Sequence, residues 1–418
     1  MSAQLTTMRD LVRAFTRAMN LISPEVQNHH EKVSYFAYRL SEAMGCSESE
    51  RRLTFYGALM HDVGSVMTEG SLSLMDIESR PSELARTGAL LLRMFPSTAS
   101  LSEIVERSQS PWEKLKRLPD QVKAPRRISQ MVHLADTVSL LLKEDVSVLN
   151  QVGEIRECIH RIGEREFDPA VLSAFDALCE RESVWLDLLY RPQLFLDDMP
   201  DDRSVSVDET IRLTELMSRI IDFRSPFTAM HSAGVAVTAQ TLAALAGMSQ
   251  DECKQMRIAG NLHDIGKLKI PKSILEKPGK LTDEGFNIMK EHAYYTYILL
   301  RDVRGFDWIA QWAAFHHEKL NNKGYPFKLS GDQIPFGSRV MAVADVFSAV
   351  AEERPYRKGM EKQKVIEVLR SDAERGALSR PIVELLIEHY DEIDALRDAE
   401  SRAASKRYQE TLKASQGD

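Results

Sequence analysis

Histidines and aspartates recur in the second half of this 418-residue chain where predominantly apolar segments end. They are His231, His263, Asp264, His292, His316, His317 and Asp345. Asp345 stands inside the otherwise apolar run 340–347, and a carboxylate buried there costs several kcal/mol unless something positive meets it. No lysine or arginine lies one helical turn away on that face, so a metal ion is the expected partner. The spacing predicts a two-metal site, which favours chemistry over a purely structural role.

The helices that must position these residues can be predicted from apolar side chains recurring at three- and four-residue spacing. The clearest examples are residues 8–21, 32–44, 51–60, 211–221 and 235–246. Strand patterns are nearly absent, so we predict an all-α protein. An acidic, proline-containing stretch near residue 200 is the expected linker. The predicted parts are a domain at 1–190, a linker at 191–206, a second domain at 207–395 and a C-terminal helix or tail at 396–418.

The composition limits the class of protein. Acidic residues outnumber basic ones, 62 to 54, for a formal net charge of −8, which argues against binding to nucleic-acid polymers or anionic membranes. Four scattered cysteines fit neither a disulfide framework nor a zinc ribbon. The N-terminus lacks a signal-peptide pattern, and no stretch approaches the roughly 18 apolar residues of a membrane span. We therefore expect a soluble, cytoplasmic protein.

An internal repeat relates the two halves of the chain. In each half a histidine precedes a His-Asp pair, by 31 positions in the first half and by 32 in the second, and a later aspartate ends an apolar run. The first-half residues are His30, His61, Asp62 and Asp136. They are a complete set for one metal ion, although a degenerate site without metal would have the same sequence. We expect a regulatory or packing domain in this half.

The two copies differ at the remaining ligand positions. Their alignment pairs Gly88 with Thr296, Leu84 with His292, Ser108 with His316, Gln109 with His317 and Ser65 with Lys267. The first copy therefore lacks the second set of ligands. We expect one competent catalytic domain behind a degenerate relative.

The second half resembles a known family. The motif His-Asp-Ile-Gly-Lys at 263–267 is followed by His-His-Glu at 316–318 and Gly-Tyr-Pro at 324–326. This order is similar to that of the HD-GYP domains, a branch of the HD superfamily of metal-dependent phosphohydrolases associated with cyclic di-GMP hydrolysis. The resemblance covers roughly residues 205–395, whereas the first half resembles only the broader superfamily. It implies two tandem HD-type helical bundles.

The resemblance implies a role for each ligand, and the chemistry supports these roles. One metal ion would be held by His231, His263, Asp264 and Asp345. Asp264 would bridge to a second ion, held also by His292, His316 and His317. Two cations about 3.5–4 Å apart require an anion between them, and a water that they share becomes a hydroxide nucleophile near neutral pH. Mixed imidazole and carboxylate ligation favours iron or manganese.

Other residues are expected to contact the substrate. Lys267 follows the bridging aspartate by three residues and is expected to stabilise charge on a phosphate oxygen. Tyr325 and Pro326 belong to the loop that in the family contributes to the substrate pocket and has been proposed to contact partner domains, here those of a cyclic di-GMP synthase. Arg354 and Arg357 match positions implicated in holding the substrate phosphates, a task that suits the two-pronged guanidinium.

The predicted activity is metal-dependent hydrolysis of cyclic di-GMP to pGpG, with further cleavage to GMP left open. The family has aspartate where this chain has Ser348 and Asn321, and a loosened selection of guanine would make 3',3'-cyclic GMP-AMP the alternative substrate. A non-catalytic cyclic-dinucleotide receptor is the alternative from another functional class. Paired helical domains often dimerise, so a homodimer also stays open.

Overall fold

The computed structural model describes residues 6–21, 28–67, 81–94, 98–119, 123–191, 203–223, 231–277, 279–352 and 359–416. Within these residues every regular element is an α-helix or a 3₁₀-helix, and an isolated β-bridge joins Thr7 to Ser204. The prediction of an all-α protein is confirmed. Among the same residues, no helix combines the length and the apolar composition needed to cross a bilayer.

The chain divides into two compact units. The C-terminal unit comprises Arg203–Lys413 and Met1–Ile22, and the N-terminal unit comprises Ser23–Asp202 and Ala414–Asp418. Helix α1, Met8–Asn20, was expected in the first domain, but it packs against α17 and η4 of the C-terminal unit. Its apolar face explains this difference, because residues such as Leu11 and Phe15 are buried there. The last helix also begins earlier than predicted, at Tyr390.

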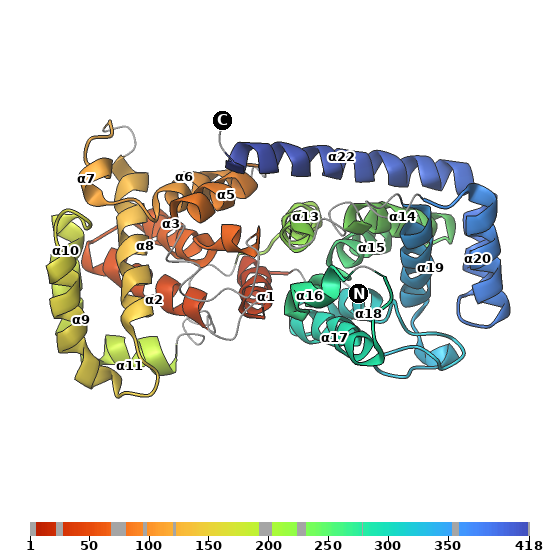
Figure 1. Cartoon of the computed structure of the whole chain (residues 1–418), viewed down its shortest axis with the longest axis horizontal. Coiled ribbons are helices and arrows are strands. Elements are labelled where there is room, and N and C mark those ends of the chain that lie inside the picture. The colour runs from red at the N-terminus through yellow and green to blue at the C-terminus, as the bar shows by residue number, and fades with distance from the viewer. Residues whose placement is uncertain are drawn as a thin grey trace. The chain divides into compact units, whose positions relative to one another are not determined.

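The C-terminal unit is built around α14, α15 and α19, which pack directly on one another (Figure 1). Val235, Met256 and Phe347 from these three helices are fully buried. Helix α13 packs against α15, and α18 packs against both α15 and α19. The remaining bounds are α13 Val207–Phe223, α14 His231–Leu245, α15 Gln250–Leu262, η4 Ile265–Lys269, α16 Lys272–Leu275, α17 Asp283–Leu300, α18 Asp307–Ala314, η5 Gly331–Gln333, α19 Phe336–Ala351, α20 Lys362–Glu374, α21 Arg380–Glu388 and α22 Tyr390–Gln416.

The N-terminal unit is built around α2, which packs against α3, α8, α10 and α11. Its aromatic core joins Phe36 to Trp185, with ring centroids 5.4 Å apart, and Trp185 to Phe175 at 6.4 Å. The helices of this unit are α2 His29–Ala43, α3 Glu48–Met60, η2 Val63–Met67, α5 Pro81–Arg93, α6 Ala99–Arg107, α7 Trp112–Leu115, α8 Lys123–Leu141, α9 Val148–Ile162, α10 Pro169–Cys179 and α11 Glu182–Tyr190.

The helices that carry the two His-Asp pairs begin and end in the same way. Both α3 and α15 have 13 residues and start with a capping box, Ser47 with Glu50 in α3 and Ser249 with Glu252 in α15. In such a box the serine and glutamate side chains satisfy backbone N–H groups that have no partner within the helix. Each helix ends at a His-Asp pair and is followed by a five-residue 3₁₀-helix. The repeat seen in the sequence is therefore a repeat of local structure.

The 3₁₀-helices approach the following long helix closely in both units. A Cβ atom on Gly266 would overlap the carbonyl oxygen of His292, and a Cβ on Gly64 would overlap that of Leu84. Only glycine permits such an approach without moving the backbone. The geometry thus pairs Leu84 with His292, as the sequence alignment predicts.

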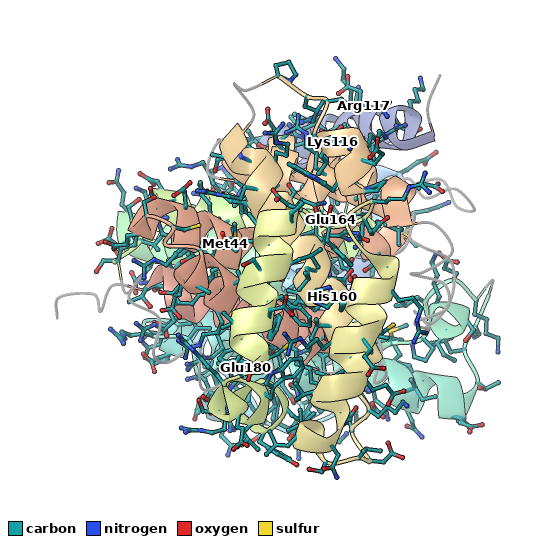
Figure 2. The ribbon with its side chains drawn as sticks, turned by 90° about the vertical axis from the view of Figure 1, so that its left-hand side faces the viewer. Met44, Lys116, Arg117, His160, Glu164 and Glu180 are labelled. Carbon is teal, nitrogen blue, oxygen red and sulfur yellow. The ribbon has the colours of Figure 1, made fainter. Side chains whose placement is uncertain are left out.

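Helices α9 and α10 present an exposed face of the N-terminal unit (Figure 2). His160 lies on this face, where its Nε2 is 2.8 Å from Oδ1 of Asp176, and Arg156 contacts the same oxygen at 2.8 Å. Exposed contacts of this kind contribute little to stability, because water screens them. His160 therefore belongs to a surface cluster with Asp176 and Arg156 and not to a buried group of histidines.

Candidate metal centre

Three histidines of the C-terminal unit are oriented by backbone carbonyl groups of their own chain segments. Nδ1 of His263 lies 2.8 Å from the carbonyl oxygen of Gly260, and the corresponding distances are 2.6 Å for His292 and 2.6 Å for His316. A carbonyl oxygen only accepts hydrogen bonds, so Nδ1 must carry the proton. In the neutral ring the lone pair is then on Nε2. That nitrogen is buried and has no hydrogen-bond partner in any of the three.

The seven predicted ligand residues come together from five places in the fold. His231 begins α14, the pair His263-Asp264 follows α15, His292 lies in α17, the pair His316-His317 follows α18, and Asp345 lies in α19. Their donor atoms form two groups compatible with metal binding: one contains His231, His263 and Asp264, and the other contains His292, His316 and His317. The groups adjoin, because the ring centroids of His263 and His316 are 5.0 Å apart.

The carboxylate of Asp264 faces both groups. Its Oδ2 lies 3.2 Å from Nε2 of His263, and its Oδ1 lies 3.6 Å from Nε2 of His292. The side chain is buried, and burial alone would raise its pKa, but the neighbouring charges of His263 and Lys267 hold the pKa well below the usual range. An ionised carboxylate with one oxygen toward each ligand group has the geometry of a bridge between two cations.

Asp345 completes the first group. Its Oδ1 lies 3.1 Å from Nε2 of His231 and 3.9 Å from Nε2 of His263. On the other side of the imidazole, Nδ1 of His231 lies 3.4 Å from Oε2 of Glu352. Burial alone would lower the pKa of His231, but the two carboxylates outweigh it and raise the pKa to about 9.

The second group offers neutral nitrogen donors. Burial lowers the pKa of His292 to about 4 and that of His316 to about 3, and it lowers the pKa of His317 well below its ordinary value. Neutral imidazoles are the form that binds metals. Buried, inward-facing Nε2 atoms beside ionised carboxylates are therefore consistent with a metal site of the kind that the sequence predicts.

Lys267 lies beside the bridging carboxylate. Its Nζ is 2.5 Å from Oδ2 of Asp264. Asp264 caps the 3₁₀-helix η4, and residues three apart lie on the same face of such a helix. Lysine supplies a compact point charge on a flexible stem. The cation is thus within reach of any anionic group bound at the two histidine groups, as its spacing in the motif predicts.

The loop containing Tyr325 and Pro326 is held by Glu318, the residue after the histidine pair. Its Oε1 accepts a hydrogen bond from the N–H of Phe327 at 2.7 Å, and its Oε2 accepts one from Leu329 at 3.0 Å. The peptide bond between Tyr325 and Pro326 is cis, and the Tyr325 ring centroid lies 4.8 Å from that of His317. This loop therefore forms one edge of the centre. Arg354 and Arg357, also assigned to the substrate, lie outside the described residues.

The N-terminal unit contains a similar cluster, but with a different first histidine. The sequence prediction used His30, whereas the structure groups His29 with His61 and Asp136. Nε2 of His29 lies 3.2 Å from Oδ1 of Asp136 and 3.4 Å from Oδ2 of Asp62. His30 is also buried, and burial lowers its pKa to about 3. The structure thus places His29, and not the predicted His30, beside the two carboxylates, because adjacent helical residues point in directions about 100° apart.

A sequence signal for His29 was available. His29 precedes His61 by 32 positions, the same separation as between His231 and His263, whereas His30 precedes His61 by 31. An exact match of spacing in the two copies would have selected the correct residue.

Two carboxylates near His231 were missed. Glu352 contacts its Nδ1, and Asp222 accepts a hydrogen bond of 2.9 Å from Oγ of Ser232. Burial, followed by the nearby charges of Asp264 and Glu352, raises the pKa of Asp222 well above its ordinary value. Asp222 also stands between apolar residues, Ile221 and Phe223, but Arg219 lies one helical turn before it, so the argument used for Asp345 did not single it out.

Comparisons with known proteins agree with this geometry. A family model described as "HD domain" matches residues 215–378. The chain is similar to "3'3'-cGAMP-specific phosphodiesterase 1" of Vibrio cholerae, with 28% identity over 94% of both proteins. It is also similar to "3'3'-cGAMP-specific phosphodiesterase 3" of that organism, with 31% identity over 60% of this chain and 58% of the relative. A cyclic di-GMP phosphodiesterase response regulator of Xanthomonas campestris has 33% identity over 55% of this chain and 60% of its own.

The chain also shares its fold with a solved structure. It is a cyclic GMP-AMP specific phosphodiesterase of V. cholerae, with a TM-score of 0.63, 21% sequence identity, and coverage of 93% of this chain and 98% of that one. On the basis of the family model, the similar sequences and the shared fold, the chain is an HD-domain protein related to the HD-GYP cyclic-dinucleotide phosphodiesterases.

Proposed function

We propose that this protein is a metal-dependent phosphodiesterase that linearises a cyclic dinucleotide, and that its substrate is 3',3'-cyclic GMP-AMP. One observation carries the proposal: the buried carboxylate of Asp264 faces two separate groups of histidine nitrogens, with one oxygen toward each. That arrangement suits two divalent ions. A receptor that only binds a nucleotide does not need it.

Two divalent ions, iron or manganese, fit the residues of the centre. The donors are imidazole nitrogens and carboxylate oxygens without sulfur, a set that suits these metals. His231, His263, Asp264 and Asp345 would hold one ion, and Asp264 with the other three histidines would hold the second. When bound, such a pair supplies a hydroxide nucleophile near neutral pH and takes up charge on the phosphodiester oxygens.

The chain's own residues bind and orient the phosphodiester. Lys267, beside the bridging carboxylate, holds a phosphate oxygen and stabilises charge that develops on it. Tyr325, against the His317 ring, forms a wall for a base or ribose. Arg354 and Arg357 bind the second phosphate, an assignment that rests on the family resemblance alone.

The choice of cyclic GMP-AMP over cyclic di-GMP rests on the relatives. The relative that matches over 94% of both proteins is named as specific for 3',3'-cyclic GMP-AMP. The cyclic di-GMP phosphodiesterase of Xanthomonas matches over 55% of this chain. Ser348 and Asn321, the two residues expected from the sequence to weaken the selection of guanine, give little support to this choice of substrate. Ser348 is only 1% exposed, and Asn321 uses its side chain to hold the loop backbone, donating to the carbonyl of Arg375 at 2.9 Å.

A competition assay tests this proposal. The metal-loaded protein is incubated with equimolar 3',3'-cyclic GMP-AMP and cyclic di-GMP, and both linear products are followed by chromatography. We expect cyclic GMP-AMP to be consumed at least about tenfold faster, a difference of about 1.4 kcal/mol in activation free energy. Faster consumption of cyclic di-GMP would reverse the substrate assignment. Tight binding of either nucleotide without cleavage would replace the enzyme by a receptor.

A further inference from the structure

We propose that the ring of Phe286 is a stacking platform for a purine base of the substrate. Phe286 lies near the start of α17, the helix that also carries His292, and 45% of the residue is exposed. The inference rests on the proposed function, because it adds a base contact to the same site. It concerns recognition of the nucleotide and gives Phe286 no part in the hydrolysis itself.

A continuous series of rings connects Phe286 to the second histidine group. The ring centroid of His317 lies 5.1 Å from that of His292 and 4.8 Å from that of Tyr325. The centroid of Phe286 lies 5.8 Å from that of Tyr325, with the two planes at 83°. Exposure increases along this series, from the buried His292 through the half-buried His317 and Tyr325 to the exposed Phe286. Phe286 is therefore the solvent-facing end of a series that begins at a predicted metal ligand.

The helix sets the distance between this ring and the reacting phosphate. Phe286 precedes His292 by six residues, and both belong to one row of side chains at three-residue spacing, with Met289 between them. Six residues of α-helix span about 9 Å along the axis. A nucleotide covers a comparable distance from its phosphate across the ribose to the base. A phosphodiester bound at the histidine groups can therefore place one of its bases at Phe286.

The chemistry beside the ring suits a nucleotide. Bases have flat π-faces that stack on exposed aromatic side chains, and basic side chains nearby attract the phosphates. Nζ of Lys290, one helical turn further along α17, lies 5.2 Å from the centroid of the Phe286 ring. A purine has a larger face than a pyrimidine and gains more from stacking. The platform therefore favours purine nucleotides but does not distinguish adenine from guanine.

Phe286 differs in burial from the phenylalanines that form the core of this unit. Phe306 is 1% exposed and Phe347 is fully buried, whereas Phe286 is 45% exposed. Replacing a side chain on the surface usually changes stability little. Loss of this ring should therefore weaken nucleotide binding and leave the helical unit folded, which makes the platform testable by substitution.

Steady-state hydrolysis of 3',3'-cyclic GMP-AMP by the metal-loaded full-length chain tests the inference. Phe286→Ala should raise KM at least about tenfold and change kcat less than about twofold, because a contact equally strong in the ground state and the transition state affects binding alone. Phe286→Trp should keep KM near the wild-type value. Phe286→Leu, which is apolar but has no π-face, should resemble Phe286→Ala.

The matched control is Phe336→Ala, since Phe336 is 48% exposed and begins α19 of the same unit. This substitution should leave KM unchanged. Far-UV circular dichroism and metal content of each variant show whether the fold and the centre are intact. An unchanged KM in Phe286→Ala, or full recovery by Phe286→Leu, would overturn the platform.

Fluorescence measures binding separately from catalysis. Phe286→Trp places an indole at the platform, and a stacked base should quench its emission when a phosphorothioate analogue of cyclic GMP-AMP, which resists hydrolysis, is added. The wild-type protein, titrated in the same way, corrects for the native tryptophans. Quenching without hydrolysis by the wild type would retain the platform and reject the enzyme. Hydrolysis without additional quenching would reject the platform and retain the enzyme, and absence of both would reject both.

Discussion

The two units contain the same helical frame with different ligand sets. In each, a histidine begins one helix, a His-Asp pair ends the next, and an aspartate lies in a later helix that packs on the first. In the C-terminal unit, α17 and α18 add three histidines to this frame. Their counterparts α5 and α6 also pack on each other, and α5 packs on η2 as α17 packs on η4. This segment supplies Leu84, Ser108 and Gln109 instead of histidines.

This difference shows that the shared helical frame does not by itself provide a two-metal site. The frame by itself brings two histidines and two carboxylates together, which suffices for one ion. A second ion requires the donors from the additional helices and a carboxylate that faces both groups, as Asp264 does. In the N-terminal unit, Oδ2 of Asp62 contacts both histidines of the same group. Four measurements test this difference between the two units.

The largest effect is expected for the bridging carboxylate. Asp264→Ala should empty both metal positions of the C-terminal unit and lower turnover by at least about a thousandfold, or about 4 kcal/mol of activation free energy. Metal content and hydrolysis rate are measured together, with the exposed Asp251→Ala on the preceding helix α15 as the control. If Asp264→Ala kept both ions, the bridging role would be excluded.

A smaller effect is expected for Glu352, whose carboxylate contacts Nδ1 of His231. Glu352→Ala should weaken metal binding at this position by about 10–100-fold, the usual cost of losing a partner that orients a ligating histidine. Competition with a chelator measures the affinity, and Glu388→Ala, an exposed glutamate of the same unit, is the control. Unchanged affinity would show that the contact between Glu352 and His231 has no part in metal binding.

The lysine of the motif distinguishes the units in a different way, since the N-terminal copy has Ser65 there. Lys267→Ala should leave the metal content near that of the wild type and lower turnover at least about tenfold, or about 1.4 kcal/mol. Lys269→Ala, two residues along the same 3₁₀-helix, should have little effect. Loss of metal in parallel with activity would reassign Lys267 to supporting Asp264.

The smallest effect is expected in the number of protons released when metal binds. The pKa of His231 is about 9 in the metal-free protein, so at pH 7 metal must displace its proton, and affinity should fall about tenfold per pH unit below 9. Calorimetry in buffers of different ionisation enthalpy should find one proton fewer released by His231→Asn. A raised pKa stabilises the folded state at low pH, so this contribution to the metal-free protein should be lost between pH 6.5 and about 9. If the wild-type protein and His231→Asn released equal numbers of protons, His231 would not be the group that loses a proton when metal binds.

Much of the site could be predicted because its residues stand in unusual sequence surroundings. Asp345 inside an apolar run, and a His-Asp pair at the end of another, are recognisable as candidate ligands from the residue pattern alone. Residues that act through neighbours have weaker signals. Glu318 and Glu352 look like ordinary surface acids in the sequence, and only their contacts with the Gly-Tyr-Pro loop and with His231 distinguish them.

The helical class, the repeat and the seven candidate ligands of the C-terminal unit could be predicted from the residue pattern, because helical periodicity and motif spacing are local properties. Three features became visible only in the folded chain: His29 rather than His30 faces Asp62 and Asp136, α1 packs with the C-terminal unit, and one oxygen of Asp264 faces each histidine group. These outcomes depend on the direction in which a side chain points after distant helices have packed. Spacing along the chain constrains that direction only loosely.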